Sequence, residues 1–197
     1  MVSDLVCSSL IGLGIDVVNL GLSTTPTVEI AVPLENADGG IILTASHNPK
    51  QWNALKLLNE KGEFISGAEG NALLEIAEKG SFIFAEVDDL GIVTNNDSYL
   101  QKHIDAVLDL PLVNIEAIKN ANFSVVIDAV NSTGGIFIPA LLKALGVHHI
   151  TKLYCEPTGQ FPHNPEPLPE HLTDLAAKIK ESKADVGFTV DPDVDRL

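Results

Sequence analysis

Short apolar runs typical of buried strands alternate along this chain with longer segments in which apolar residues recur at helical spacing. The runs that predict strands are residues 17–22, 41–44, 125–130, 150–154 and 186–190. The segments that predict helices are residues 2–13, 25–32, 98–108, 114–121, 136–145 and 169–180, with a further helix after residue 66. Alternation of this kind is typical of parallel sheets that are covered by helices.

The same order of elements occurs twice, and the second series begins near residue 97. A chain of 197 residues with 45% hydrophobic content can bury a sizeable core in each series. We therefore predict an α/β fold of two successive three-layer α/β/α units with mixed, mainly parallel sheets. The predicted domains are residues 1–97 and residues 98–197.

Two segments depart from the alternation. Residues 55–58 and 63–65 are separated by a short polar stretch with a glycine, which predicts a hairpin. Ser66 and Glu69 then form a capping box, which predicts that a helix begins there. Residues 156–169 contain five prolines and are expected to form a long irregular surface loop, a kind of segment that is often functional.

Composition excludes several classes of function. The net charge is -15 and only 12 residues are Lys or Arg, so extended contact with nucleic acid or an anionic membrane is not expected. The apolar runs are far shorter than the roughly 20 residues needed to span a bilayer. The N-terminus shows no basic segment followed by an apolar one, and Cys7 and Cys155 are far apart in apolar surroundings. We expect free thiols in a cytoplasmic protein.

The stretch "TASHNPKQWNALK", residues 44–56, follows the apolar run 41–43. Ser46 in such a place is usually a turn former or a helix cap. His47 alone is more often a structural hydrogen-bonding residue than a base, and Lys56 alone could be a solvated side chain. Taken separately, each residue has an ordinary explanation, and only their coincidence suggests chemistry.

Three aspartates, Asp191, Asp193 and Asp195, directly follow the predicted strand 186–190. Open α/β sheets usually bind ligands at the carboxyl ends of their strands. Carboxylates held together there repel one another, and a hard divalent cation with oxygen ligands, such as Mg²⁺, would relieve that repulsion. An EF-hand loop is excluded because Arg196 occupies its sixth position, where glycine is required. A solvated acidic turn remains the alternative.

These motifs together resemble the α-D-phosphohexomutase family of phosphomannomutases, phosphoglucomutases and phosphoglucosamine mutases. The segments that carry the resemblance are "TASHNP" at 44–49 followed by Asn53 and Lys56, "DPDVDR" at 191–196, "GQFPHNPEP" at 159–167 and "STTPT" at 23–27. Members of this family have four domains. The resemblance implies that residues 1–97 are an N-terminally incomplete first domain with the phosphoserine loop. Residues 98–197 would be the second domain, with the metal loop at its end, and the third and fourth domains would be absent.

The resemblance also implies a chemistry. Family members are isomerases that interconvert hexose 1-phosphates and 6-phosphates through a phosphoserine and a bisphosphate intermediate, and Ser46 matches the phosphoserine. Asp191, Asp193 and Asp195 match the ligands of Mg²⁺, with an oxygen of Ser46 or its phosphate completing the set. The implied partner is a small phosphosugar, and the oligomeric state is left open.

Three further residues match positions of the family's site. Lys56 matches the general base that accepts the proton of the sugar hydroxyl, aided by His47. Arg196 matches a residue that contacts the phosphoserine or the substrate phosphate, for which a planar guanidinium is suited. Ala54 stands where the family usually has glycine.

The resemblance favours a phosphomannomutase or a phosphoglucosamine mutase. Because remote phosphate binding supplies much of the energy that orients such substrates, we expect this piece alone to turn over little substrate. The alternative is a non-catalytic metal-binding or phosphosugar-binding module on a mutase fold.

Overall fold

The computed structural model describes residues 1–48 and 51–197, so the last residue of the "TASHNP" motif lies outside the described part. The described chain forms two compact units. The first unit comprises Met1–Gly21, Val28–Leu43 and Ala54–Asp97, and the second comprises Leu22–Thr27, Thr44–Asn53 and Ser98–Leu197. The loop with Ser46 therefore groups with residues 98–197, while the domain limits expected from the sequence stay a prediction.

The first unit contains two separate pairs of strands. Strands β1 (Val17–Asn19) and β4 (Val93–Asn95) are parallel, whereas β2 (Gly40–Leu43) and β3 (Leu55–Leu58) are antiparallel. The sequence did not predict β4, since its three residues are too few to show a strand pattern. The predicted hairpin is confirmed only in part, because β3 pairs with β2 and meets the following segment only at one bridge, between Leu58 and Phe64.

Helices and a small apolar core complete the first unit. The helices are α1 (Val2–Gly12), most of α2 (Thr25–Leu34), α3 (Gly67–Lys79) and a 3-10 turn at Val87–Asp89. Val32, Ile42 and Leu58 form the buried cluster, so α2, β2 and β3 are held together by the same apolar contacts. The predicted capping box begins α3: the Ser66 hydroxyl accepts from the Glu69 amide, and the Glu69 carboxylate accepts from the Ser66 amide.

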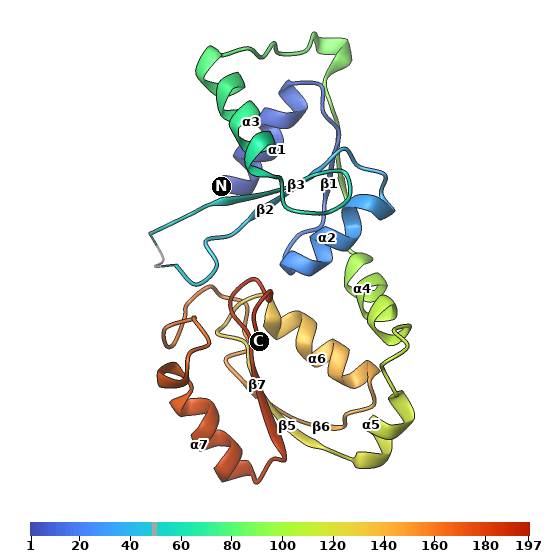
Figure 1. Ribbon diagram of the computed structural model, residues 1–197, viewed down its shortest axis with the longest axis vertical. Coiled ribbons are helices and arrows are strands. Elements are labelled where there is room, and N and C mark those ends of the chain that lie inside the picture. The colour runs from blue at the N-terminus through green and yellow to red at the C-terminus, as the bar shows by residue number, and fades with distance from the viewer. Residues whose placement is uncertain (49–50) are drawn as a thin grey trace. The chain divides into compact units, whose positions relative to one another are not determined.

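The second unit is a parallel three-stranded sheet covered on both faces (Figure 1). Its elements are α4 (Tyr99–Leu108), α5 (Ile115–Ala121), β5 (Ser124–Asp128), α6 (Gly134–Ala144), β6 (His149–Leu153), a 3-10 turn (Pro169–His171), α7 (Thr173–Ser182) and β7 (Val186–Thr189). The strand order is β6-β5-β7. The α/β fold with helix-covered parallel strands is thus confirmed in this unit.

Alternating side chains of the central strand explain the two covered faces. Val125 and Ile127 of β5 pack with Leu142 of α6. The opposite face is adjacent to α7, since a side chain at Gly187 of β7 would overlap Ile179. No helix in the described ranges 1–48 and 51–197 has the length and apolar character needed to cross a membrane.

The carboxyl ends of β5 and β7 lead into loops with unusual backbone. Val130 has φ 43°, Asn131 has φ 55° and Val194 has φ 65°, in the left-handed region that β-branched residues rarely adopt. Residues held in this region often cluster at functional sites. Of these two loops, the one after β7, which contains Val194, carries the predicted metal ligands Asp191, Asp193 and Asp195.

Candidate active site

Ser46 lies in a tight turn that the backbone of its own loop stabilises. Its φ is 49°, and its amide donates to the Thr44 hydroxyl at 2.9 Å. Its Oγ donates to Asp191 Oδ2 at 2.8 Å and lies 3.3 Å from Nδ1 of His47. The turn thus holds a half-buried hydroxyl against a carboxylate that is 145 positions away in the sequence.

The acidic loop after β7 brings its three carboxylates together. Ligand atoms from Asp191, Asp193 and Asp195 lie within 4.8 Å of one another. Asp191 and Asp193 are buried, whereas Asp195 is exposed. The left-handed conformation of Val194 turns the chain between the last two, so that the amides of Asp195 and Arg196 both donate to Asp191 Oδ1 at 3.2 Å.

Thr25, at the start of α2, holds the acidic loop from the other side. Its hydroxyl donates to Asp193 Oδ2 at 2.6 Å, and its amide donates to the Asp193 carbonyl at 2.8 Å. Thr25 is fully buried, and its neighbour Thr24 is almost fully buried. The sequence analysis did not assign Thr25 a role, although the "STTPT" motif that contains it was part of the resemblance.

The electrostatics of this loop favour a bound cation. Burial raises the pKa of Asp191 to about 6, and the hydrogen bond from Ser46 opposes this shift. The charges of Asp193 and Asp195 raise the pKa further. A divalent cation would offset both the lost hydration and the repulsion, and clustered carboxylate oxygens are the ligands that hard cations prefer. The residues present therefore fit a hard divalent metal.

Glu166 connects two of the predicted site residues. Its Oε1 lies 3.8 Å from Nε2 of His47 and 3.6 Å from a guanidinium nitrogen of Arg196. It comes from the proline-rich loop, which the sequence singled out without naming this residue. Glu166 thus lies close to both side chains, and its carboxylate attracts the guanidinium of Arg196.

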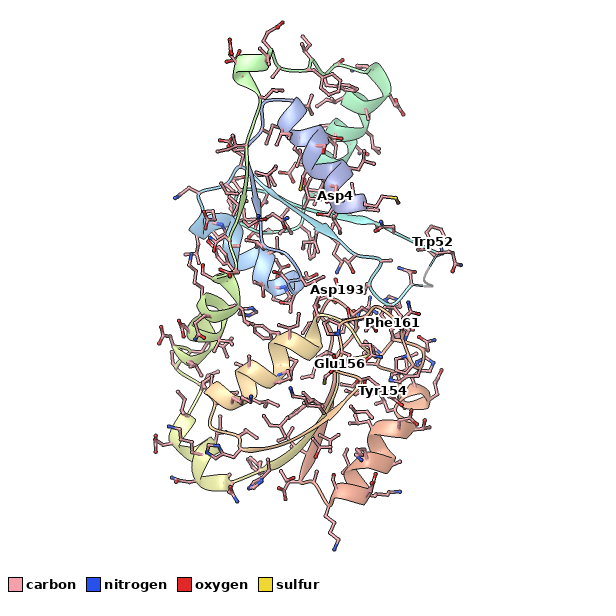
Figure 2. The ribbon with its side chains drawn as sticks, turned by 180° about the vertical axis from the view of Figure 1, so that it is seen from behind. Asp4, Trp52, Tyr154, Glu156, Phe161 and Asp193 are labelled. Carbon is pink, nitrogen blue, oxygen red and sulfur yellow. The ribbon has the colours of Figure 1, made fainter. Side chains whose placement is uncertain are left out.

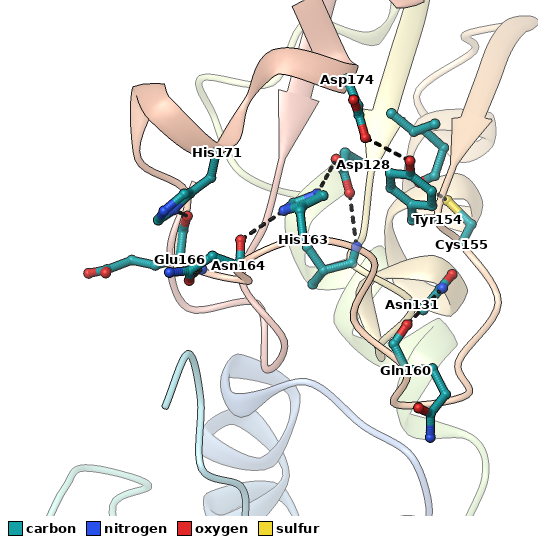
Figure 3. Close-up of polar contacts among 12 residues, drawn as sticks. Asp128, Asn131, Tyr154, Cys155, Gln160, His163, Asn164, Glu166, His171 and Asp174 are labelled. Atoms are coloured by element: carbon teal, nitrogen blue, oxygen red, sulfur yellow. Dashed lines mark hydrogen bonds and ion pairs between the residues drawn. The ribbon is translucent and has the colours of Figure 1, made fainter. Parts of the chain in front are cut away.

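The proline-rich loop is anchored to the carboxyl edge of the sheet (Figure 3). Nε2 of His163 lies 2.9 Å from the buried carboxylate of Asp128 at the end of β5. Nδ1 of His163 lies 2.8 Å from the Asn164 carbonyl, and the Asn131 amide donates to the Gln160 carbonyl at 3.0 Å. These contacts fix the segment that presents Glu166 and Phe161.

Lys56 lies on β3, in the first unit, whereas the other predicted site residues belong to the second unit. Its Nζ is 5.7 Å from the ring centroid of Phe64. The proposed role of Lys56 as a base therefore stays a prediction, while Ser46, His47, the three aspartates and Arg196 form one cluster.

A pocket of about 200 Å³ opens beside Ser46 within the second unit. We call it the Ser46 pocket. Its described lining residues are Thr44, Ala45, Ser46, Asn48, Trp52, Ser132, Gly159, Phe161 and Pro192. Phe161 and Trp52 are labelled in Figure 2.

Comparison with known proteins supports one family. The model of phosphoglucomutase/phosphomannomutase alpha/beta/alpha domain I matches residues 1–84, and that of domain II matches residues 101–197. A phosphoglucomutase/phosphomannomutase of Thermococcus kodakarensis is 34% identical over 197 residues, all of this chain and 42% of that protein. A phosphoglucomutase of Neisseria gonorrhoeae is 38% identical over 93% of this chain and 38% of that protein.

Solved structures with a similar fold belong to the same family. A phosphoglucomutase/phosphomannomutase family protein from Burkholderia thailandensis superposes with a TM-score of 0.80 at 28% identity, covering 97% of this chain and 41% of that one. A putative phosphomannomutase from Thermus thermophilus gives 0.82 at 25% identity, covering 100% and 45%. This chain spans less than half the length of each of these relatives. From its fold and from the two family models, which together match most of its length, the chain belongs to the phosphoglucomutase/phosphomannomutase family.

Proposed function

We propose that this chain carries the phosphoryl-transfer centre of a phosphohexomutase, in which Ser46 alternately holds and donates the phosphoryl group. The observation that carries the proposal is the 2.8 Å hydrogen bond between Ser46 Oγ and Asp191 Oδ2, which places a nucleophilic hydroxyl at the carboxylate cluster. The reaction would interconvert a hexose 1-phosphate and a hexose 6-phosphate through a bisphosphate. Mannose and glucosamine phosphates are the proposed substrates, since relatives carry those names.

The acidic cluster would hold Mg²⁺, with Asp191, Asp193, Asp195 and an oxygen of Ser46 as ligands. When bound, the cation neutralises charge on the phosphoryl oxygens. A phosphoserine at this position adds about two negative charges beside three carboxylates, so the cluster requires that neutralisation.

The chain's own residues supply the proton transfers. As the phosphorus leaves Ser46 Oγ for a sugar hydroxyl, one P–O bond breaks and another forms, and the hydroxyl proton passes to a base, for which we propose Lys56. Ser46 Oγ then regains a proton, and His47 Nδ1 lies 3.3 Å from it. Arg196, oriented by Glu166, would contact the phosphate.

Mass spectrometry tests the proposal directly. After incubation with Mg²⁺ and a hexose 1,6-bisphosphate, the wild-type chain is expected to gain one phosphate that maps to Ser46. Ser46→Ala should gain none, and Asp191→Asn should gain far less. Absence of phosphate from wild-type Ser46 would contradict the proposal. If Mg²⁺ or a hexose phosphate nevertheless binds, the result favours the alternative of a non-catalytic binding module.

A further inference from the structure

A buried histidine that the proposed reaction does not use lies at the end of a chain of hydrogen bonds that reaches the acidic cluster. We infer that His103 is a positioning residue, which fixes the orientation of the proposed metal ligand Asp193 through three threonines. The chain runs from His103 to Thr27 and Thr24, which together we call the His103 relay, and then to Thr25, which holds Asp193. This inference rests on the proposed function, because Asp193 is one of the ligands proposed there.

The His103 relay is a set of buried side chains within the second unit. Nδ1 of His103 lies 2.8 Å from the Thr27 hydroxyl, and the Thr27 hydroxyl lies 2.7 Å from the Thr24 hydroxyl. The imidazole packs on the ring of Phe137 in α6, with the two ring centroids 4.4 Å apart. Because the side chains of the relay are buried, water has little access to compete for these hydrogen bonds.

The relay ends at the first turn of α2. The Thr24 hydroxyl accepts from the Thr27 amide at 3.2 Å, which is the hydrogen bond of a helix N-cap. Thr25 begins the helix, where amides have no partner within the helix. Its amide donates to the Asp193 carbonyl at 2.8 Å, and its hydroxyl donates to Asp193 Oδ2 at 2.6 Å. The turn that the relay fixes thus holds both the backbone and the carboxylate of Asp193.

Stability alone does not explain why the residues of the relay are polar. Replacing both partners of a buried hydrogen bond with apolar groups of similar shape is nearly neutral for stability. Burial lowers the pKa of His103, so at neutral pH its ring is uncharged and forms no charge-assisted bond. A hydrogen bond has a preferred direction, which an apolar contact lacks. The relay therefore defines the rotation of two hydroxyls and the path of the turn that contains Thr25.

Metal affinity should respond to this arrangement because a cation requires its ligands in fixed positions. Mutating a residue that hydrogen-bonds to a metal ligand typically weakens metal binding by about 10-fold to 100-fold. Thr25 is such a residue for Asp193, since its hydroxyl contacts one carboxylate oxygen. A change in the His103 relay that turns Thr25 should therefore weaken Mg²⁺ binding, although every ligand is kept.

A double variant separates positioning from packing. Thr27→Val alone removes the hydroxyl that contacts His103 and should lower the melting temperature. Thr27→Val combined with His103→Leu makes both partners apolar, so it should melt close to the wild-type temperature. We nevertheless expect its Kd for Mg²⁺, measured by calorimetry well below the melting temperature, to rise about tenfold. Thr24→Ala, which removes the hydroxyl between Thr27 and the helix start, should raise the Kd in the same way.

Conservative variants and a core variant are the controls. Thr27→Ser keeps the hydroxyl, and His103→Gln keeps a neutral group that can bond to Thr27, so both should bind Mg²⁺ as the wild type does. Val147→Ala, in the apolar core of the second unit, should lower the melting temperature and leave the Kd unchanged. A structural role alone would instead make the Kd follow the melting temperature.

Hydrogen exchange of the Thr25 amide tests the relay without a metal. In the metal-free double variant this amide should exchange faster than in the wild type, while the amides of β5 should not change. Wild-type Mg²⁺ affinity in both the double variant and Thr24→Ala, or an unchanged Thr25 amide, would overturn the relay. Failure of the proposed function is a separate result: if Ser46 gains no phosphate, or the wild type binds no Mg²⁺, exchange at Thr25 still decides whether the relay holds that turn.

Discussion

At the scale of single residues, the site depends on one buried carboxylate. Asp191 accepts three hydrogen bonds, from the Ser46 hydroxyl and from the amides of Asp195 and Arg196. Burial and the neighbouring acids nevertheless raise its pKa to about 6. The local structure therefore retains a charged group at some cost to stability, which is understandable if the carboxylate serves a ligand.

Asp191→Asn should separate metal binding from folding. The amide oxygen can still accept hydrogen bonds, so the metal-free variant should melt at the wild-type temperature or slightly above it. The stabilisation by Mg²⁺, about 2.7 kcal/mol at a hundredfold excess over Kd, should be largely lost. Thermal melts with and without Mg²⁺ measure both effects. The exposed Asp109→Asn is the control, and an equal loss in both variants would contradict the assignment.

His103 should make stability depend on pH. It is 7% exposed, its Nδ1 lies 2.8 Å from the Thr27 hydroxyl, and its ring packs on Phe137. Burial lowers its pKa, so the unfolded chain takes up a proton more readily than the folded one. Its contribution to the free energy of unfolding is therefore present above the ordinary histidine pKa of about 6.5 and is lost as the pH falls below it.

Urea unfolding at about pH 7.5 and about pH 5.5, on either side of that ordinary pKa, measures the effect. The wild-type chain should lose more stability between these values than His103→Gln, in which the neutral amide can still bond to Thr27. His149→Gln, at an exposed position, should lose as much as the wild type. Parallel losses in wild type and His103→Gln would show that His103 is not the group responsible.

At the scale of elements, capping residues set where a helix begins and ends, and close backbone contacts limit which residues it can contain. The α3 helix begins at a capping box and ends at Gly80, which has φ 60°. These signals are local in the sequence, and the helix begins where they predicted. Ser66→Ala should destabilise the chain by about 1 kcal/mol because the Glu69 amide loses its acceptor. Hydrogen exchange in the first turn of α3 should increase, whereas Ser81→Ala, beyond the end of the helix, should change neither measurement.

The first turn of α6 should not tolerate a side chain at Gly135. An added methyl group would overlap the backbone oxygen of Cys155, which cannot move as a side chain can. We expect Gly135→Ala to lower the free energy of unfolding by about 1–3 kcal/mol. Gly67→Ala is the matched control at the start of α3, where nothing lies within 4 Å, and it should be neutral or slightly stabilising. Chemical denaturation compares the two, and equal effects would refute this packing argument.

At the scale of the whole molecule, each unit has its own pattern of strands. The second unit follows the alternation of strand and helix in the sequence, since a crossover helix between neighbouring strands produces parallel pairing. The first unit does not follow it fully. Its β3 strand returns antiparallel to β2. Its β4 strand lies parallel to β1, although paired residues such as Val17 and Val93 are 76 positions apart in the sequence.

The sequence by itself determined the types of most elements and the close spacing of Asp191, Asp193 and Asp195, and it singled out Ser46 as a candidate for chemistry. Periodicity, caps and short motifs are properties of neighbouring residues, so they can be read along the chain. Only the tertiary structure decided that Ser46 meets Asp191 across 145 positions and that Thr25 holds Asp193 across 168. Contacts of that kind depend on strand order and on the path of loops, which local preferences do not specify.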